Sequence, residues 1–250
     1  MEKGFFLIWV CLSFVGQKTW AQTQKVPGNG PVIVLESGLG DDHSTWSPVA
    51  KKLGRLGRVF RYDRAGYGSR PIENPRRDGL TLVAELRAQL AEAHLEPPYL
   101  LVGHSMGGMV VELFARHYPN EVMGVIFVDA RHAQFTQWCR ESGEAKGCDL
   151  PKWALALMPQ AAQLEFAAME QTQEQIRQSP PFPAVPVAVL TGTRKPFTNR
   201  AFRSVWLESQ NQLAQLSPIS NHQVCEKCGH YIHRDKPKLL IEAVEWVLAQ

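Results

Sequence analysis

The sequence predicts an α/β fold with a mostly parallel central sheet and helices on both faces. Short apolar runs alternate with helix-like segments along the chain, and this alternation is typical of a parallel sheet. Several runs are apolar at every position, as strands buried on both faces are. With 250 residues, 44% of them apolar and 20% charged, the chain suits one globular domain with a sizeable core.

The expected strands are apolar runs that lead directly into a turn. They cover residues 32–35, 59–62, 99–102, 122–128 and 185–190. Proline cannot donate a hydrogen bond to a sheet, so Pro186 indicates that the last strand begins there or lies near an edge.

The expected helices place apolar residues at helical spacing. Leucines recur every four residues over 81–94, and the prolines at 97 and 98 terminate this helix. A second helix starts at Met106 and stops before Pro119, and a final helix carries the apolar residues of 239–247.

A long insertion separates the last two expected strands. The 55 residues from Ala130 to Ala184 show no strand pattern, and insertions of this length are usually functional. We expect a small helical cap over about 131–184 with an apolar inner side, although the same residues could instead extend the core. The apolar candidates are Trp153, Leu157, Leu164, Phe166 and Met169.

The N-terminus has the layout of a signal peptide over residues 1–21. A polar start ends in Lys3, an apolar run follows from Phe5 to Val15, and Thr19-Trp20-Ala21 precedes Gln22. The run is too short to cross a bilayer, which takes roughly 20 apolar residues. We therefore expect a secreted or periplasmic domain over 22–250 with no membrane span after cleavage, and an uncleaved tether is the alternative.

Charge gives no indication of a nucleic-acid partner. The net charge is +3, and the basic residues are scattered rather than clustered.

Four cysteines remain after the expected cleavage, and an even number in an exported chain favours disulfides. We favour the local pairs, Cys139 with Cys148 and Cys225 with Cys228, while cross-pairing stays open. A zinc site that joins the second pair to His222 or His233 lacks a ligand pair at finger-like spacing.

Ser105 lies in the most informative motif of the chain. Gly103-His104-Ser105-Met106-Gly107 fits the nucleophile elbow, in which a serine sits at a strained turn between a strand and a helix. An apolar strand is expected before this motif and a helix after it. We therefore expect Ser105 to be a nucleophile.

Together with this elbow, three further segments make the chain resemble the esterase-like members of the α/β-hydrolase fold family. They are Glu36-Ser37-Gly38-Leu39-Gly40, Tyr62-Asp63-Arg64-Ala65-Gly66-Tyr67-Gly68 and Gly229-His230. The resemblance implies that the backbone N–H groups of Leu39 and Met106 stabilise the oxyanion. Many relatives have histidine at the position of Ser37, but the backbone does the oxyanion work, so this departure should not abolish it.

The same resemblance places the general base at His230, just ahead of the last helix, with His222 and His233 as nearby rivals. Many relatives carry the acid in the loop after the penultimate strand, yet 191–199 contains no carboxylate. We expect Asp129, at the end of the preceding strand, to be the acid instead, although a strand-end aspartate can simply cap the next turn.

These residues predict an exported serine hydrolase that cleaves a small-molecule ester through an acyl-enzyme intermediate, with no metal or organic cofactor. An amidase, thioesterase or lactonase would use the same groups. A binding protein on the same fold with an inactive triad is the alternative from another class.

Overall fold

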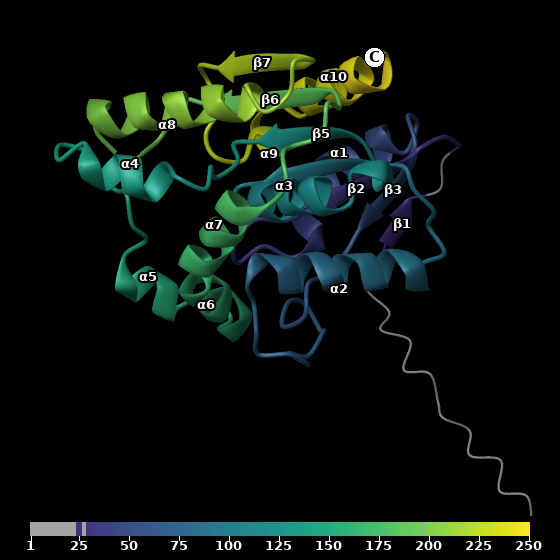
Figure 1. Ribbon diagram of the computed structural model, residues 1–250, viewed down its shortest axis with the longest axis horizontal. Helices are drawn as coiled ribbons and strands as arrows, with labels where there is room; N and C mark the ends of the chain where they lie inside the picture. The colour runs from purple at the N-terminus through teal and green to yellow at the C-terminus, as the bar shows by residue number, and fades with distance from the viewer. Residues whose placement is uncertain (1–23, 27–28, 197) are drawn as a thin grey trace, which may run out of the picture.

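The computed structural model describes residues 24–26, 29–196 and 198–250, so the expected signal peptide lies outside the described residues. Within these residues the centre is a seven-stranded sheet with the order β1-β3-β2-β4-β5-β6-β7 (Figure 1). The strands are β1 (Gln24–Val26), β2 (Val32–Glu36), β3 (Arg58–Arg61), β4 (Tyr99–His104), β5 (Val122–Val128), β6 (Val187–Gly192) and β7 (Ser220–Cys225).

Six strands run parallel, and β1 pairs antiparallel with β3 at one edge. The mostly parallel sheet expected from the sequence is therefore confirmed. The central strands β2, β4 and β6 are buried along their whole length, as their unbroken apolar runs predict. Parallel strands deliver their carboxyl ends to one edge, and this edge positions the site described below.

Helices cover both faces of the sheet. They are α1 (Ser47–Leu53), α2 (Gly79–Glu92), α3 (Gly107–His117), α4 (Phe135–Glu141), α5 (Lys152–Ala156), α6 (Gln160–Ala167), α7 (Met169–Gln178), α8 (Arg200–Ala214), α9 (Ile232–Asp235) and α10 (Pro237–Leu248), with single turns η1 (His43–Trp46) and η2 (Pro119–Glu121). Residues from α2, α3 and α8 pack with Val34 and Leu101 of the sheet. Residues from α1, α9 and α10 pack with Ile33 and Leu100, because successive strand residues face opposite sides.

A helical cap, α4 to α7, lies between β5 and β6, which confirms the expected insertion. Figure 1 shows α5 and α6 set apart from the sheet, below α4 and α8 in this view. The expected apolar inner side is wrong for Trp153 and Leu157, which are 71% and 80% exposed on and just after the short helix α5. Instead Ala161 and Ala162 of α6 are buried against Tyr67.

The edge strand β7 was not expected from the sequence. Its residues Ser220–Cys225 read SNHQVC, and most of them are partly or fully exposed. A strand at the edge of a sheet is held by backbone hydrogen bonds to one neighbour, here β6, and needs no apolar run. The expected strand at 185–190 starts at Val187, directly after Pro186.

The four cysteines lie in the two local pairs. The sulfur atoms of Cys139 and Cys148 are 2.07 Å apart, and those of Cys225 and Cys228 are 1.92 Å apart. The first pair closes the loop after α4, and the second stands at the end of β7, just before His230. No helix in the described part of the chain is long and apolar enough to cross a bilayer.

Candidate active site

Ser105 occupies a tight turn between β4 and α3. Its backbone φ is 53°, which is uncommon for a residue with a side chain. Its N–H donates to the carbonyl of Val128 (3.2 Å), and its carbonyl accepts from Gly108 N–H (3.1 Å) and Arg131 N–H (2.9 Å). These bonds to the end of β5 and the start of α3 hold the strained turn and leave the hydroxyl partly exposed.

Glycines let the nucleophile turn pack against the loop after β2. A Cβ atom on Gly107 would lie 2.6 Å from the carbonyl oxygens of Glu36 and Ser37. A Cβ atom on Gly38 would lie 3.2 Å from Cβ of Ser105. Larger residues at these two positions would push the loop away from the serine.

Asp129 ends β5 with a φ of 44°, and its carboxylate is buried completely. Oδ1 accepts from the backbone N–H of Gly192 (3.0 Å) and the indole N–H of Trp206 (3.1 Å). Oδ2 accepts from Nδ1 of His230 (2.6 Å) and from the Lys195 ammonium. Burial alone would raise the pKa of Asp129, but Lys195 and His230 lower it to about 2, so the group is a carboxylate at neutral pH.

His230 lies in the loop between β7 and α9 and reaches the same edge of the sheet. Because Asp129 can only accept, His230 Nδ1 carries the proton in this pair, and Nε2 of the neutral ring is left as a base. No hydrogen bond joins His230 to the Ser105 hydroxyl, although both are described residues. The rings of His230 and His104, the neighbour of Ser105, have centroids 4.6 Å apart.

The pKa of His230 is lowered from the ordinary value of 6.5. Burial is the largest cause, and the nearby His104 and Lys195 act in the same direction, against the raising effect of Asp129. The neutral ring, which can accept a proton, is therefore the main form at neutral pH.

The rival histidines are engaged elsewhere. His233 is completely buried and its Nε2 lies 3.2 Å from the Thr45 hydroxyl. His222 is bonded through Nε2 to the Thr191 hydroxyl (2.8 Å). Of the three candidates, His230 is the one that contacts Asp129.

The two expected oxyanion donors flank the serine. Leu39 follows Gly38, and Met106 precedes the first residue of α3, where a helix presents unpaired N–H groups. In the described part of the chain neither N–H has a hydrogen-bond acceptor. Both groups can therefore bind an oxygen that becomes negative during attack on a carbonyl.

A buried arginine fixes the loop that carries Leu39. The Arg64 guanidinium donates from Nη1 to the carbonyl of Ser37 (2.7 Å) and from Nη2 to the carbonyl of Gly38 (2.8 Å). In a trans peptide the C=O and N–H groups point in opposite directions. The N–H of Leu39 therefore points away from Arg64.

Arg64 is held in turn by a carboxylate from the cap. Glu165 of α6 accepts from Arg64 Nε (2.9 Å) and Nη2 (3.0 Å), from the Tyr67 hydroxyl (2.6 Å) and from Arg77 Nη2 (3.0 Å). Glu36 of β2 accepts from Arg64 Nη1 (2.7 Å). Burial would lower the pKa of Arg64, but Glu165 and Glu36 raise it well above its ordinary value, so the guanidinium stays charged.

Sequence reasoning missed several of these groups. The segment 191–199 contains no carboxylate, and nothing in it indicated that the Lys195 ammonium contacts Asp129. Trp206 and Glu165 gave no signal because they lie in α8 and α6, far along the chain from the residues they contact. Arg64 stood in a motif that supported the resemblance, but the motif did not reveal that its side chain bonds the oxyanion loop.

One cluster of side chains has the composition of a metal site. The ligand atoms of Asp42, His43 and Asp63 lie within 4.8 Å of one another. The backbone N–H of His43 donates to Asp63 Oδ1 (2.7 Å), and its ring Nδ1 lies 2.8 Å from the same oxygen. Hydrogen bonds between the loop after β2 and Asp63, which follows β3, thus account for the contact of His43 with Asp63.

Comparison with known proteins agrees with this architecture. The model of the Alpha/beta hydrolase family matches residues 32–243. The uncharacterized protein YqjL of Bacillus subtilis (strain 168) is 26% identical over 217 residues, which is 86% of this chain and 83% of that protein.

Solved structures are similar at lower identity. A thermophilic esterase from Thermogutta terrifontis has a TM-score of 0.63 and 19% identity, with 91% of this chain and 92% of that chain covered. The enol-lactonase from Burkholderia xenovorans LB400 has a TM-score of 0.64 and 18% identity, with 91% and 96% covered. At such identities the likeness shows the shared fold.

The charge of Lys195 gives a prediction about pH. If His230 is the base, kcat/KM rises with pH as His230 loses its proton, so the acidic limb should lie below pH 6.5. Lys195→Met removes a cation that lowers the pKa of His230, so the limb should move to higher pH. The measurement is kcat/KM for p-nitrophenyl acetate from pH 4.5 to 8. Lys238→Met, which removes an exposed cation on α10, is the matched control. A limb that stays in place or moves to lower pH in Lys195→Met contradicts this account.

The cap carboxylate gives a second prediction. Glu165→Gln should lower kcat by about tenfold with little change in KM, because a loosened Arg64 no longer orients the Leu39 N–H. The free energy of unfolding should fall by about 3 kcal/mol, since a buried ion pair loses one partner. Steady-state kinetics and urea unfolding measure the two effects. Glu174→Gln, an exposed carboxylate on α7, should change neither. A loss of stability with kcat unchanged would mean that Glu165 holds the fold and does not act on the oxyanion loop.

Proposed function

This chain belongs to the alpha/beta hydrolase family, and on that basis we propose that it is a serine hydrolase that cleaves small carboxylic esters. The observation that carries the proposal is the pairing of Asp129 with His230 at the sheet edge where Ser105 stands in its strained turn. A buried acid that fixes the tautomer of a histidine is the support that a nucleophilic serine requires.

In the proposed reaction His230 Nε2 takes the proton of the Ser105 hydroxyl as its oxygen attacks the ester carbonyl. The carbonyl oxygen becomes an oxyanion, which the N–H groups of Leu39 and Met106 stabilise. His230 then gives the proton to the departing alcohol, and an acyl-enzyme remains. A water molecule, deprotonated by His230, attacks the acyl-enzyme and releases the acid and the free serine.

Ester is the bond we favour because it is the least demanding substrate for this machinery. The fold is shared with a thermophilic esterase and with an enol-lactonase, which supports hydrolysis of an ester or cyclic ester. Amides and thioesters would pass through the same intermediate. We also propose that the protein is exported with both cysteine pairs oxidised. This rests on the sequence of residues 1–21 and on the pairing of Cys139 with Cys148 and of Cys225 with Cys228.

The proposal is tested by changing the nucleophile. Ser105→Ala should lower kcat for p-nitrophenyl esters by about a thousandfold or more, because no other group can form the acyl-enzyme. The wild-type protein should be labelled by a fluorophosphonate at the peptide that contains Ser105, as located by mass spectrometry. The esters should span acyl chains of two to twelve carbons, so that the same series measures the preferred length.

Circular dichroism should show that Ser105→Ala remains folded. Turnover that survives in the folded variant would rule out the serine mechanism. A wild-type protein that neither turns over esters nor reacts with the fluorophosphonate would support a binding protein on the same fold.

A further inference from the structure

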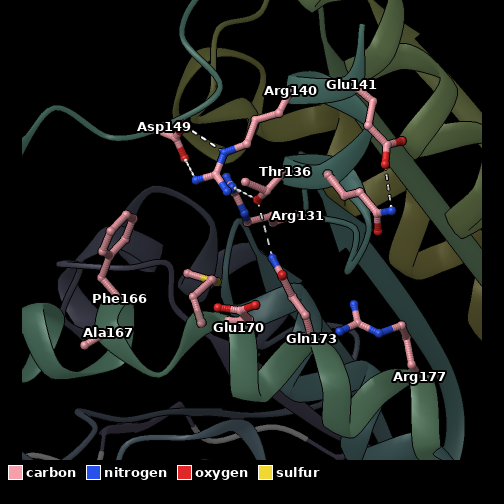
Figure 2. Close-up of a pocket in the computed structure, with 12 residues that line it drawn as sticks. Arg131, Thr136, Arg140, Glu141, Asp149, Phe166, Ala167, Glu170, Gln173 and Arg177 are labelled. Carbon is pink, nitrogen blue, oxygen red and sulfur yellow. Dashed lines mark hydrogen bonds and ion pairs between the residues drawn. The ribbon is translucent and has the colours of Figure 1, made fainter.

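A cavity of about 640 Å³ lies between the cap helices. One wall is formed by α4, and the opposite wall by the end of α6 and by α7 (Figure 2). A cavity of this size is large enough for a small organic molecule. Arg131, in the segment between β5 and α4, also lines it.

Arg131 connects this cavity to the nucleophile. It follows Asp129 by two residues, and its backbone N–H donates to the carbonyl of Ser105 (2.9 Å). The backbone of Arg131 therefore lies against the strained turn, while its side chain extends into the cavity. Neither Ser105 nor His230 lines the cavity, so a substrate with its ester carbonyl at Ser105 would have to extend past the Arg131 backbone to reach the guanidinium.

No carboxylate of the described residues lies within ion-pair distance of the Arg131 guanidinium, although the charge of Asp149 acts on it from farther away. Nη2 donates to the Thr136 hydroxyl, and the guanidinium carbon lies 5.2 Å from the centre of the Phe135 ring. Nε is buried without an acceptor. Burial lowers the pKa of Arg131 to about 10, so the group is still a cation at neutral pH. A largely buried cation without an anion is costly unless a partner binds.

Other cations around the cavity are already neutralised. Arg140 binds Asp149 (2.6 Å), and Arg177 binds Glu174 (2.5 Å). Arg131 is therefore the cation in this wall that still has capacity for an anion.

The carboxylates of the wall do not fill this role. Glu141 accepts from the Gln137 amide (2.8 Å), and Glu170 is exposed and lies beyond ion-pair distance of Arg131. Glu170 adds a negative charge to the lining, so the cavity suits a single negative charge better than a phosphate dianion.

We propose that Arg131 binds a carboxylate carried by the substrate, which makes this protein a hydrolase of esters with a free acid group, such as half-esters of dicarboxylic acids. The proposal rests on the function proposed above. A guanidinium presents parallel N–H groups that match the two oxygens of a carboxylate, and Nη1 of Arg131, unlike the buried Nε, is not enclosed and has no hydrogen bond among the described residues. The neutral ester would leave Arg131 unpaired, so the acidic substrate should be preferred.

The test compares two esters of matched chain length, monomethyl glutarate and methyl pentanoate, by pH-stat at pH 7.5 and 0.15 M salt. The wild-type protein should show kcat/KM at least about tenfold higher for monomethyl glutarate, as one charged hydrogen-bonded contact allows. Arg131→Gln should reduce this ratio by about tenfold or more. Lys238→Met removes an exposed cation on α10, outside the cavity, and it should leave the ratio within about twofold.

Binding is measured separately so that the two proposals can fail independently. Calorimetry with the Ser105→Ala protein should detect monomethyl glutarate but not methyl pentanoate, and Ser105→Ala combined with Arg131→Gln should bind neither. Binding by Ser105→Ala without turnover by the wild type would leave the carboxylate site standing and refute the proposed hydrolysis. Equal kcat/KM for the two esters, or a ratio unchanged in Arg131→Gln, would overturn the carboxylate site and leave the hydrolase proposal intact.

Discussion

The buried carboxylate of Asp129 is the interaction on which the arrangement of the site depends. Four groups from different parts of the chain donate to it: the backbone of Gly192 at the end of β6, Lys195, Trp206 in α8 and His230. A fully buried negative charge would be costly without such donors. The need to satisfy one carboxylate therefore draws the end of β6, α8 and the histidine loop to the end of β5.

A second buried network connects the cap to the oxyanion loop. Glu165 of α6 and Glu36 of β2 hold Arg64, and Arg64 bonds the carbonyls of Ser37 and Gly38. Movement of α6 would therefore displace the Arg64 guanidinium, and this displacement would change the orientation of the Leu39 N–H. The cap in this structure both shapes the cavity beside Arg131 and takes part in fixing the geometry around Ser105.

The sequence predicted what depends on local pattern and missed what depends on distant contacts. The buried strands, the α3 helix and the turn at Ser105 follow from apolar runs and glycines that are neighbours in the chain. Strand β7 was not predicted because a polar strand at the edge of a sheet has no apolar run to indicate it. The contact between Lys195 and Asp129 was missed because the two residues lie 66 positions apart in the chain. Trp153 was expected to be buried on the inner side of the cap because it is apolar. It lies on the five-residue helix α5, where its side chain stays largely exposed.

Turnover by Asp129→Asn tests the central claim most directly. Asparagine tolerates a positive φ, and its oxygen can keep the bonds from Gly192 and Trp206. Its amide N–H would then face Nδ1 of His230 and favour the tautomer with the proton on Nε2, which cannot accept from Ser105. We predict a fall in kcat by about a thousandfold or more with a folded protein, and no such fall in the partly exposed control Glu242→Gln on α10. A folded Asp129→Asn protein that keeps most of its activity would contradict the account.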